Sequence, residues 1–156
     1  MKKNLRNNSP EDSQKAFNLS LRYLNLRIRS TKEIQDYLFK KGFSKQAIDE
    51  VIERLKNLKF LNDKTFGESL IRNRQRKGKS SYLISYELKQ KGLDEKTISE
   101  LKENSLNDLE TAKNFVERKK HLYQSLSKIE YRNKMGRLLQ SRGFSWDVIK
   151  KAIEEE

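Results

Sequence analysis

The chain has 156 residues, and its 35 Lys and Arg outnumber its 22 Asp and Glu to give a net charge of +13. It has no cysteine, which excludes a disulfide framework and a thiolate metal site. Charged residues make up 37% and hydrophobic residues 34%, a composition that favours solvated helices over thick sheets. We therefore expect an all-α protein. The charge predicts a polyanionic partner, because cations that neutralise phosphates release counterions; the alternative is a basic surface that only aids solubility.

The N-terminal segment is not typical of export. Residues 1–11 are polar, and we expect them to form a flexible tail. Their basic start is followed by polar residues instead of the apolar stretch of a signal peptide. No apolar run approaches the ~18 residues of a membrane span. We expect a cytoplasmic protein that does not bind membranes.

Residues 12–61 carry three successive helical patterns. The first has apolar residues at helical spacing, namely Phe17, Leu21, Leu24 and Ile28. Ser30 opens the second helix, with Glu33 at the spacing of a capping box. This helix ends at Gly42, since glycine adopts a left-handed C-terminal cap without strain. Ser44 caps a third helix, so that one unit comprises three helices.

The pattern of the second and third helices then recurs twice. Its reference positions are Ile34, Leu38, Gly42, Phe43, Ser44, Ile48 and Val51. At an offset of 50 residues these become Ile84, Leu88, Gly92, Leu93, Asp94, Ile98 and Leu101. After a further 51 residues they become Met135, Leu139, Gly143, Phe144, Ser145, Ile149 and Ala152. Chance recurrence of helix-turn-helix punctuation is the alternative, and seven matched positions in each comparison argue against it.

The opening helix of each copy is more variable in sequence. Asn62 or Asp63 caps the one in the second copy. Asn107, with Glu110 three residues later, caps the one in the third copy, which we expect to be the longest and to continue through Leu122 and Leu126.

The repeats predict a tandem architecture. The three copies are residues 12–61, 62–106 and 107–156, each a helix-turn-helix-like unit of three helices. Because one such unit buries little apolar surface alone, neighbours stack on each other. We therefore expect nine helices in an elongated, curved array.

A basic stretch stands at the end of the helix that opens the second copy. It consists of Arg72, Arg74, Arg76, Lys77 and Lys79. Cations at a helix C-terminus complement the helix dipole, but five within eight positions exceed what one dipole uses. Positions 72, 76 and 79 share a face if the helix persists, so this stretch is the leading candidate for binding phosphates or an acidic protein surface.

Further cations lie near the glycines of successive copies. They are Lys40, Lys41, Lys89, Lys91, Arg137 and Arg142. Stacking of the copies would align them into a stripe, and we include them among the binding candidates. Tyr82, Tyr86 and Trp146 are either stacking platforms for bases or packing residues, and the packing role is favoured.

The sequence offers no reactive constellation. His121 is the only histidine and lies in a basic, solvated run without a conspicuous second ligand. Gly78, Lys79 and Ser80 lack the upstream glycine of a Walker motif, and are better interpreted as a loop that ends in an N-cap. We expect no enzymatic activity, no cofactor and no metal.

Several motifs occur in order from about Ala16 to the end of the chain. In chain order they are Arg29, Ser30 and Glu33; then Phe60, Leu61, Asn62, Asp63 and Phe66, with the basic stretch up to Gly78; then Glu87, Leu88, Lys91 and Gly92; and finally Leu138, Leu139, Arg142, Gly143, Phe144 and Ser145. In this order they resemble the RecX family, regulators of the RecA recombinase. Gly67 stands where the family usually has alanine, a change that weakens a helix by ~0.5–1 kcal/mol.

The resemblance implies a fold of three tandem three-helix repeats and a modulator of RecA. Such a protein binds in the groove of the RecA filament on single-stranded DNA, and mostly inhibits strand exchange and ATP turnover in homologous recombination, DNA repair and the SOS response. It implies no catalytic residues, and we expect a monomer. The rival hypotheses are a stand-alone DNA- or RNA-binding repeat protein and a scaffold for acidic proteins.

Overall fold

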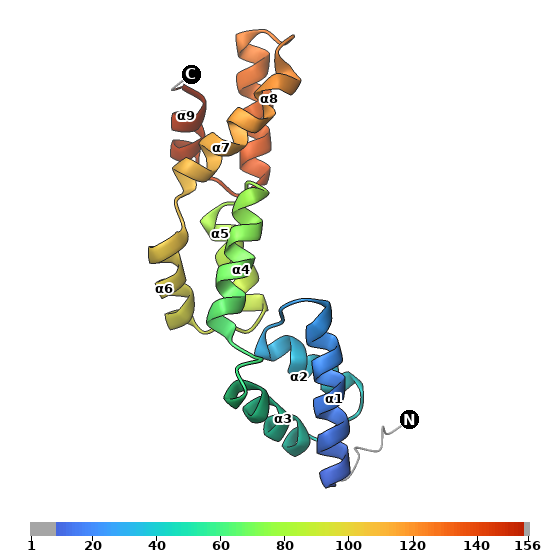
Figure 1. Ribbon diagram of the computed structural model, residues 1–156. Coiled ribbons are helices and arrows are strands. Elements are labelled where there is room, and N and C mark those ends of the chain that lie inside the picture. The colour runs from blue at the N-terminus through green and yellow to red at the C-terminus, as the bar shows by residue number, and fades with distance from the viewer. Residues whose placement is uncertain (1–8, 155–156) are drawn as a thin grey trace. The chain divides into compact units, whose positions relative to one another are not determined.

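The computed structural model describes residues 9–154, and these residues form nine α-helices and one 3-10 helix with no strand (Figure 1). The all-α prediction is confirmed for these residues. The helices are α1 (Pro10–Leu26), α2 (Thr31–Lys40), α3 (Lys45–Asn57), α4 (Asp63–Arg76), α5 (Ser81–Gln90), α6 (Glu95–Ser105), α7 (Asp108–Lys120), α8 (Lys128–Ser141) and α9 (Trp146–Glu154). In residues 9–154 no helix is long and apolar enough to cross a membrane.

Side-chain caps fix most helix starts, as the sequence predicts. Ser30 accepts the Glu33 N–H at 3.2 Å while Glu33 accepts the Ser30 N–H at 3.1 Å, a complete capping box. Ser44, Asp94 and Asn107 cap α3, α6 and α7 through N–H groups three residues later. These bonds satisfy backbone donors that have no partner within the helix.

The recurring glycines end the second helix of each triplet. Gly42, Gly92 and Gly143 have φ of 87°, 87° and 84°, the left-handed conformation that the sequence predicts. A Cβ on Gly143 would approach Ser80 Oγ to 2.5 Å, so space as well as backbone conformation requires glycine there.

Two boundaries differ from the sequence prediction. Helix α1 begins at Pro10, earlier than predicted, because Ser9 accepts the Asp12 N–H and proline suits the first helical turn. Residues 1–8 of the predicted tail lie outside the described residues. Helix α1 ends at Leu26, and Ile28, predicted to be part of its apolar face, is 41% exposed beyond its end.

Helix α7 is shorter than predicted. It ends at Lys120 and a 3-10 turn, His121–Tyr123, follows it. Leu122 is 55% exposed, so burial of this side chain does not stabilise a continuation of the helix, although its spacing fits the apolar face of α7.

The described residues divide into two compact units. The first runs to Phe66 and includes Lys91–Leu93; the second comprises Gly67–Gln90 and the residues from Asp94 onward. The core of the first unit packs α1, α2 and α3, and its buried members are Ala16, Phe17, Ile34, Leu38, Phe43, Ile48, Val51, Ile52, Leu55 and Leu61. Within the second unit, α7, α8 and α9 bury Ala112, Phe115, Val116, Met135, Leu139, Phe144, Ile149, Ala152 and Ile153. The matched apolar positions of the repeats are therefore core positions, which explains their recurrence.

Candidate nucleic-acid interface

The basic stretch lies where α4 ends and turns toward α5. Arg72, Arg74 and Arg76 belong to α4, and Lys77 and Lys79 flank Gly78 in the turn. Gly78 has φ of 69°, and a Cβ on it would overlap the Phe115 ring of α7. The Lys79 N–H donates to the Arg74 carbonyl at 3.0 Å and closes the helix end. The turn thus fixes the direction in which the chain leaves the basic stretch.

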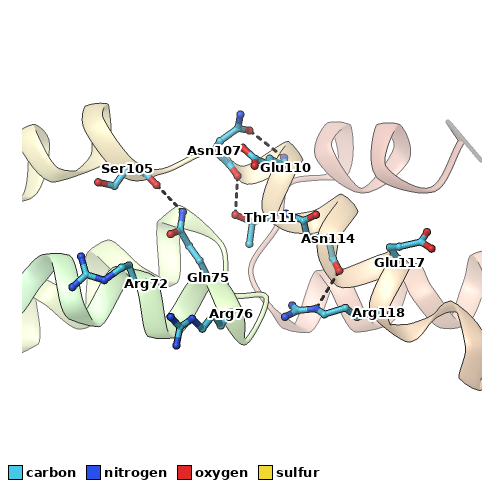
Figure 2. A pocket seen from close by; sticks show the side chains of 10 residues that line it. All are labelled: Arg72, Gln75, Arg76, Ser105, Asn107, Glu110, Thr111, Asn114, Glu117 and Arg118. Atoms are coloured by element: carbon cyan, nitrogen blue, oxygen red, sulfur yellow. Dashed lines mark hydrogen bonds between the residues drawn. The ribbon is translucent and has the colours of Figure 1, made fainter.

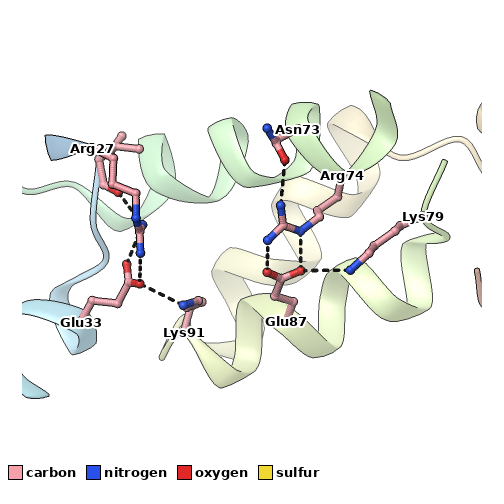
Figure 3. Close-up of polar contacts among 8 residues, drawn as sticks. Arg27, Glu33, Asn73, Arg74, Lys79, Glu87 and Lys91 are labelled. Carbon is pink, nitrogen blue, oxygen red and sulfur yellow. Dashed lines mark hydrogen bonds and ion pairs between the residues drawn. The ribbon is translucent and has the colours of Figure 1, made fainter. Parts of the chain in front are cut away.

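The Arg74 side chain is paired with a carboxylate of the same chain, Glu87. Its Nε donates to Glu87 Oε2 at 2.7 Å, and its Nη2 forms a second bond to Oε1 (Figure 3). Lys79 Nζ lies 4.0 Å from the same carboxylate. The hydrogen bonds that Arg74 donates to the Glu87 carboxylate raise the pKa of Arg74 above its ordinary value, although partial burial opposes this. Arg74 and Lys79 therefore join α4 to α5, and their charges are partly neutralised within the second unit.

Arg72 and Arg76 lie on another part of α4 and border a pocket. Both are exposed, and neither side chain forms a hydrogen bond or ion pair with any residue in 9–154. The pocket has a volume of about 610 Å³. Figure 2 shows Arg118 of α7 reaching toward the end of α4 that carries Arg76. We call this site the arginine pocket; the other residues that line it are Gln75, Ser105, Asn107, Glu110, Thr111, Asn114 and Glu117.

Hydrogen bonds position the walls of the arginine pocket. Gln75 Nε2 donates to the Ser105 carbonyl at 2.6 Å and ties α4 to the end of α6. Arg118 Nε donates to the Asn114 carbonyl at 3.2 Å, which leaves its two terminal nitrogens available. The pocket is assembled from α4 and from a later, continuous part of the chain that comprises the end of α6 and helix α7.

The lining of the arginine pocket suits an anion. Three guanidinium groups stand against two carboxylates, and one of these, Glu117, lies 3.9 Å from Lys120 Nζ. Planar guanidinium groups donate paired hydrogen bonds that match phosphate oxygens. The pocket holds no histidine, cysteine or lysine, and no group of three His, Cys, Asp or Glu in the described residues is placed to bind a metal.

Arg142 is used for packing. Its guanidinium lies over the Phe115 ring at 4.3 Å, and its Nη1 donates to the Lys77 carbonyl at 2.7 Å. The Arg142 carbonyl accepts the Ser80 N–H at 3.0 Å. The end of α8 is thereby joined to the α4–α5 turn, while the Lys77 side chain stays exposed.

The other predicted cations also divide into engaged and exposed side chains. Lys91 Nζ donates to Glu33 Oε1 at 2.9 Å within the first unit, and Lys89 Nζ donates to Glu95 at 2.6 Å in the second. Lys41 lies 5.5 Å from the centre of the Tyr37 ring. Lys40 and Arg137 are exposed. The alignment of these cations into one stripe stays a prediction.

The three aromatic residues for which packing was favoured are on the surface. Tyr82, Tyr86 and Trp146 are 71%, 59% and 72% exposed. The preference for packing was wrong, because the apolar side of α5 is covered through Ile84 and Leu88 and the tyrosines face away from it. Sequence reasoning also missed Arg118, whose position near α4 depends on the packing of α7.

Matches to known proteins decide the family. Three family models match in chain order: the first three-helix domain of RecX at residues 16–55, the second at 62–101 and the third at 107–153. They cover most of the chain, one domain for each helical triplet. This chain belongs to the RecX family.

Relatives named regulatory protein RecX extend the similarity. The Bacillus licheniformis protein is 38% identical over 148 residues, which cover 93% of this chain and 56% of the relative. The Pelodictyon phaeoclathratiforme protein is 34% identical over 148 residues, covering 94% of this chain and 89% of the relative. The chain thus spans little more than half the length of the Bacillus relative and most of the length of the other.

Solved RecX structures have the same fold. The crystal structure of RecX from Lactobacillus salivarius matches with a TM-score of 0.77 and 28% identity, covering 94% of this chain and 97% of that one. A second crystal structure, of a regulatory protein RecX, has a TM-score of 0.75 at 22% identity and shows the fold alone. Membership in a family of regulatory proteins confirms the prediction of a non-enzymatic protein.

Proposed function

We propose that this chain binds the RecA filament assembled on single-stranded DNA, and that binding inhibits the recombinase and ATPase activities of RecA during homologous recombination, DNA repair and the SOS response. The observation that carries the proposal is the match of all three RecX domains, in order, over most of the chain. A net charge of +13 supports a nucleoprotein partner. In this proposal the chain acts as a monomer in the bacterial cytoplasm, where the filament forms.

The arginine pocket is the part of the surface that we assign to DNA phosphates. Its three guanidinium groups are exposed or retain free donors, whereas Arg74, Lys91 and Arg142 are occupied by partners in the chain. An extended single strand presents phosphates that bidentate donors bind with little dependence on base sequence. Lys77, exposed beside the pocket, adds to the local positive potential.

Regulation follows if the chain binds one state of the filament better than another. A ligand shifts an equilibrium only by its difference in affinity for the two states. Tandem helical domains give an extended set of contacts, so a change in the spacing of filament subunits alters several contacts together. We propose that the chain favours a filament state with low ATP turnover.

A stand-alone nucleic-acid-binding protein is the second candidate. The exposed arginines favour it, because such a pocket binds phosphate without a protein partner. The two candidates differ in how tightly the chain binds naked DNA relative to the assembled filament.

One titration separates the candidates. Binding is measured to naked single strands, to free RecA and to RecA on single strands, each at two salt concentrations. The filament proposal predicts markedly tighter binding to the assembled filament than to either component. Equal affinity for naked strands and filament contradicts it, and a steep loss of naked-strand affinity with salt then favours the second candidate.

Charge reversal tests the arginine pocket. We expect Arg72→Glu, Arg76→Glu and Arg118→Glu together to raise the chain concentration needed for half-inhibition of RecA ATPase by about tenfold or more, because three phosphate contacts become repulsive. The matched control reverses three exposed lysines elsewhere with the same change in net charge, Lys45→Glu, Lys56→Glu and Lys96→Glu. Equal effects of the two triple variants would mean that only total charge matters. Circular dichroism checks that helicity is retained.

A further inference from the structure

A second surface feature lies between α8 and α9, well apart in sequence from the basic stretch. This α8–α9 groove has a volume of about 450 Å³. Trp146, the first residue of α9, stands at the groove and is 72% exposed. Ile149 contributes apolar surface, and Asn133 and Gln140 contribute amides. A large, exposed tryptophan is costly to hydrate, so a surface tryptophan beside polar groups is a typical binding residue.

Gly136 keeps one wall of the groove open. It lies in the interior of α8, where glycine is less favourable than alanine by ~0.5–1 kcal/mol. Packing does not require it, since a Cβ at this position would meet nothing nearer than Ile149 Cγ2 at 4.0 Å. Its backbone is not in the left-handed region either. The missing side chain therefore serves neither the turn nor the core, but it does leave space in the groove.

The same groove occurs in the second triplet with a different lining. Each of the eight residues that line the α5–α6 groove stands 51 positions before a residue of the α8–α9 groove. The groove is therefore a property of the three-helix unit, and only its lining distinguishes one copy from the other. Where the α8–α9 groove has Trp146, the α5–α6 groove has Glu95, which is paired with Lys89 at 2.6 Å.

Charge also distinguishes the two copies. The α5–α6 groove has two lysines and two glutamates, whereas the α8–α9 groove has three cations, Arg132, Arg137 and Lys150, and one carboxylate. That carboxylate, Glu154, lies 3.8 Å from Arg132. Arg137 and Lys150 have no carboxylate partner among residues 9–154. The α8–α9 groove thus combines one aromatic face with two unneutralised cations.

We propose that the α8–α9 groove binds single-stranded nucleic acid, with one base stacked on the Trp146 indole and the flanking phosphates paired with Arg137 and Lys150. The combination of an aromatic platform with cations beside it matches the alternation of base and phosphate along a strand. Asn133 and Gln140 supply donors and acceptors for the base edge. Because cations exceed carboxylates in the groove, it suits a strand of nucleic acid better than a peptide with few acidic residues. The site deepens the proposed function by adding a second strand contact, yet its test does not require RecA.

Intrinsic fluorescence reports on the site directly, because Trp146 is the only tryptophan of the chain. The full chain is titrated with oligothymidylate at low salt. Stacking predicts saturable quenching of the emission, at the same oligonucleotide concentration at which the anisotropy of a labelled strand rises. Anisotropy that rises without any change of tryptophan emission places the strand elsewhere and overturns the proposal.

Variants test the role of each part with the labelled strand. Trp146→Ala should weaken binding by about fivefold or more, and Trp146→Phe by less, because stacking on an aromatic ring is worth at least that factor. Gly136→Leu should weaken binding by filling the groove while helicity is unchanged or higher. Ile129→Ala, on the same helix and 73% exposed outside the groove lining, is the matched control and should bind as the parent does.

The failures of this proposal and of the proposed function are distinguishable. If Trp146→Ala binds oligothymidylate like the parent but loses affinity for the RecA filament, the groove binds protein and this proposal is wrong. If the chain binds the strand through Trp146 yet shows no preference for the filament, the groove stands and the filament proposal falls. Loss of strand binding in Ile129→Ala to the same extent as in Trp146→Ala also contradicts the assignment.

Discussion

Two carboxylates, Glu33 in the first unit and Glu87 in the second, each gather an arginine and a lysine (Figure 3). Glu33 accepts from Arg27 at 2.7 Å and from Lys91 at 2.9 Å, and it also closes the capping box of α2. Glu87 accepts the paired bonds of Arg74, with Lys79 more distant. The Glu33 side chain is 12% exposed and that of Glu87 is 22% exposed.

The comparison teaches that net charge overstates the number of cations available to a partner, because some of them are paired within the chain. Lys91, Arg74 and Lys79 were all predicted to bind RecA or DNA, and all three contact a carboxylate of their own unit. Glu33 combines ion pairs with a backbone cap, whereas Glu87 depends mainly on one guanidinium. Losing Glu33 should therefore cost more than losing Glu87.

The largest expected effect separates these two carboxylates. Glu33→Ala removes the side-chain half of the capping box, in which Glu33 accepts the Ser30 N–H, and leaves two partly covered cations without their carboxylate, so we expect the free energy of unfolding to fall by ~2–3 kcal/mol. Glu87→Ala should cost ~1–2 kcal/mol, since it removes one bidentate pair at a more exposed site. Urea unfolding followed by circular dichroism measures both. A larger loss in Glu87→Ala would show that the cap contributes little.

The fold was predictable because its signals are local. Ser30 with Glu33 and the glycines at 42, 92 and 143 act through neighbouring backbone atoms, and the structure has the predicted caps and left-handed turns. Helix lengths were less predictable. The helical spacing of apolar residues predicts that α7 continues past Lys120, but the helix ends there and Leu122 is exposed instead of packing in a core.

The candidate sites were only partly predictable, since they depend on tertiary packing. The sequence shows the basic stretch as a cluster of charge, but it does not reveal that Arg74 pairs with Glu87 while Arg72 and Arg76 line a pocket together with Arg118. Exposure of an aromatic residue likewise depends on which face of a helix the neighbours cover. Trp146 begins α9 on the solvated side, and no local pattern marks it as exposed.

A smaller effect separates neighbouring arginines of α4. Arg74→Lys retains the charge but loses the guanidinium fork, and we expect it to reduce the free energy of unfolding by ~1–2 kcal/mol. Arg72→Lys, the matched control on the same helix, should change it by less than ~0.5 kcal/mol because that side chain has no partner in the described residues. Both are measured by urea unfolding. Equal free energies of unfolding for the two variants would mean that the paired hydrogen bonds of Arg74 to Glu87 do not stabilise the fold.

The smallest expected effect is the pH dependence of the Glu33 cluster. Burial raises the pKa of Glu33, but hydrogen bonds from Arg27, Lys91 and the Ser30 N–H lower it more, to about 2 from an ordinary 4.5. Because the folded-state pKa lies below the unfolded one, the stabilisation is complete above about pH 5 and is lost as pH falls toward 2. Solvent screening reduces its size, so by about pH 3.5 we expect Glu33 to account for roughly 1 kcal/mol of lost stability.

Glu33→Gln is the matched control for this pH dependence, because glutamine retains a capping-box acceptor but does not titrate. The difference in unfolding free energy between parent and variant should therefore shrink by roughly 1 kcal/mol from about pH 7 to about pH 3.5. Other carboxylates titrate over the same range, but they do so equally in both chains and cancel in the difference. A constant difference would mean that the Glu33 carboxylate keeps its ordinary pKa and that Lys91 and Arg27 do not stabilise its charge.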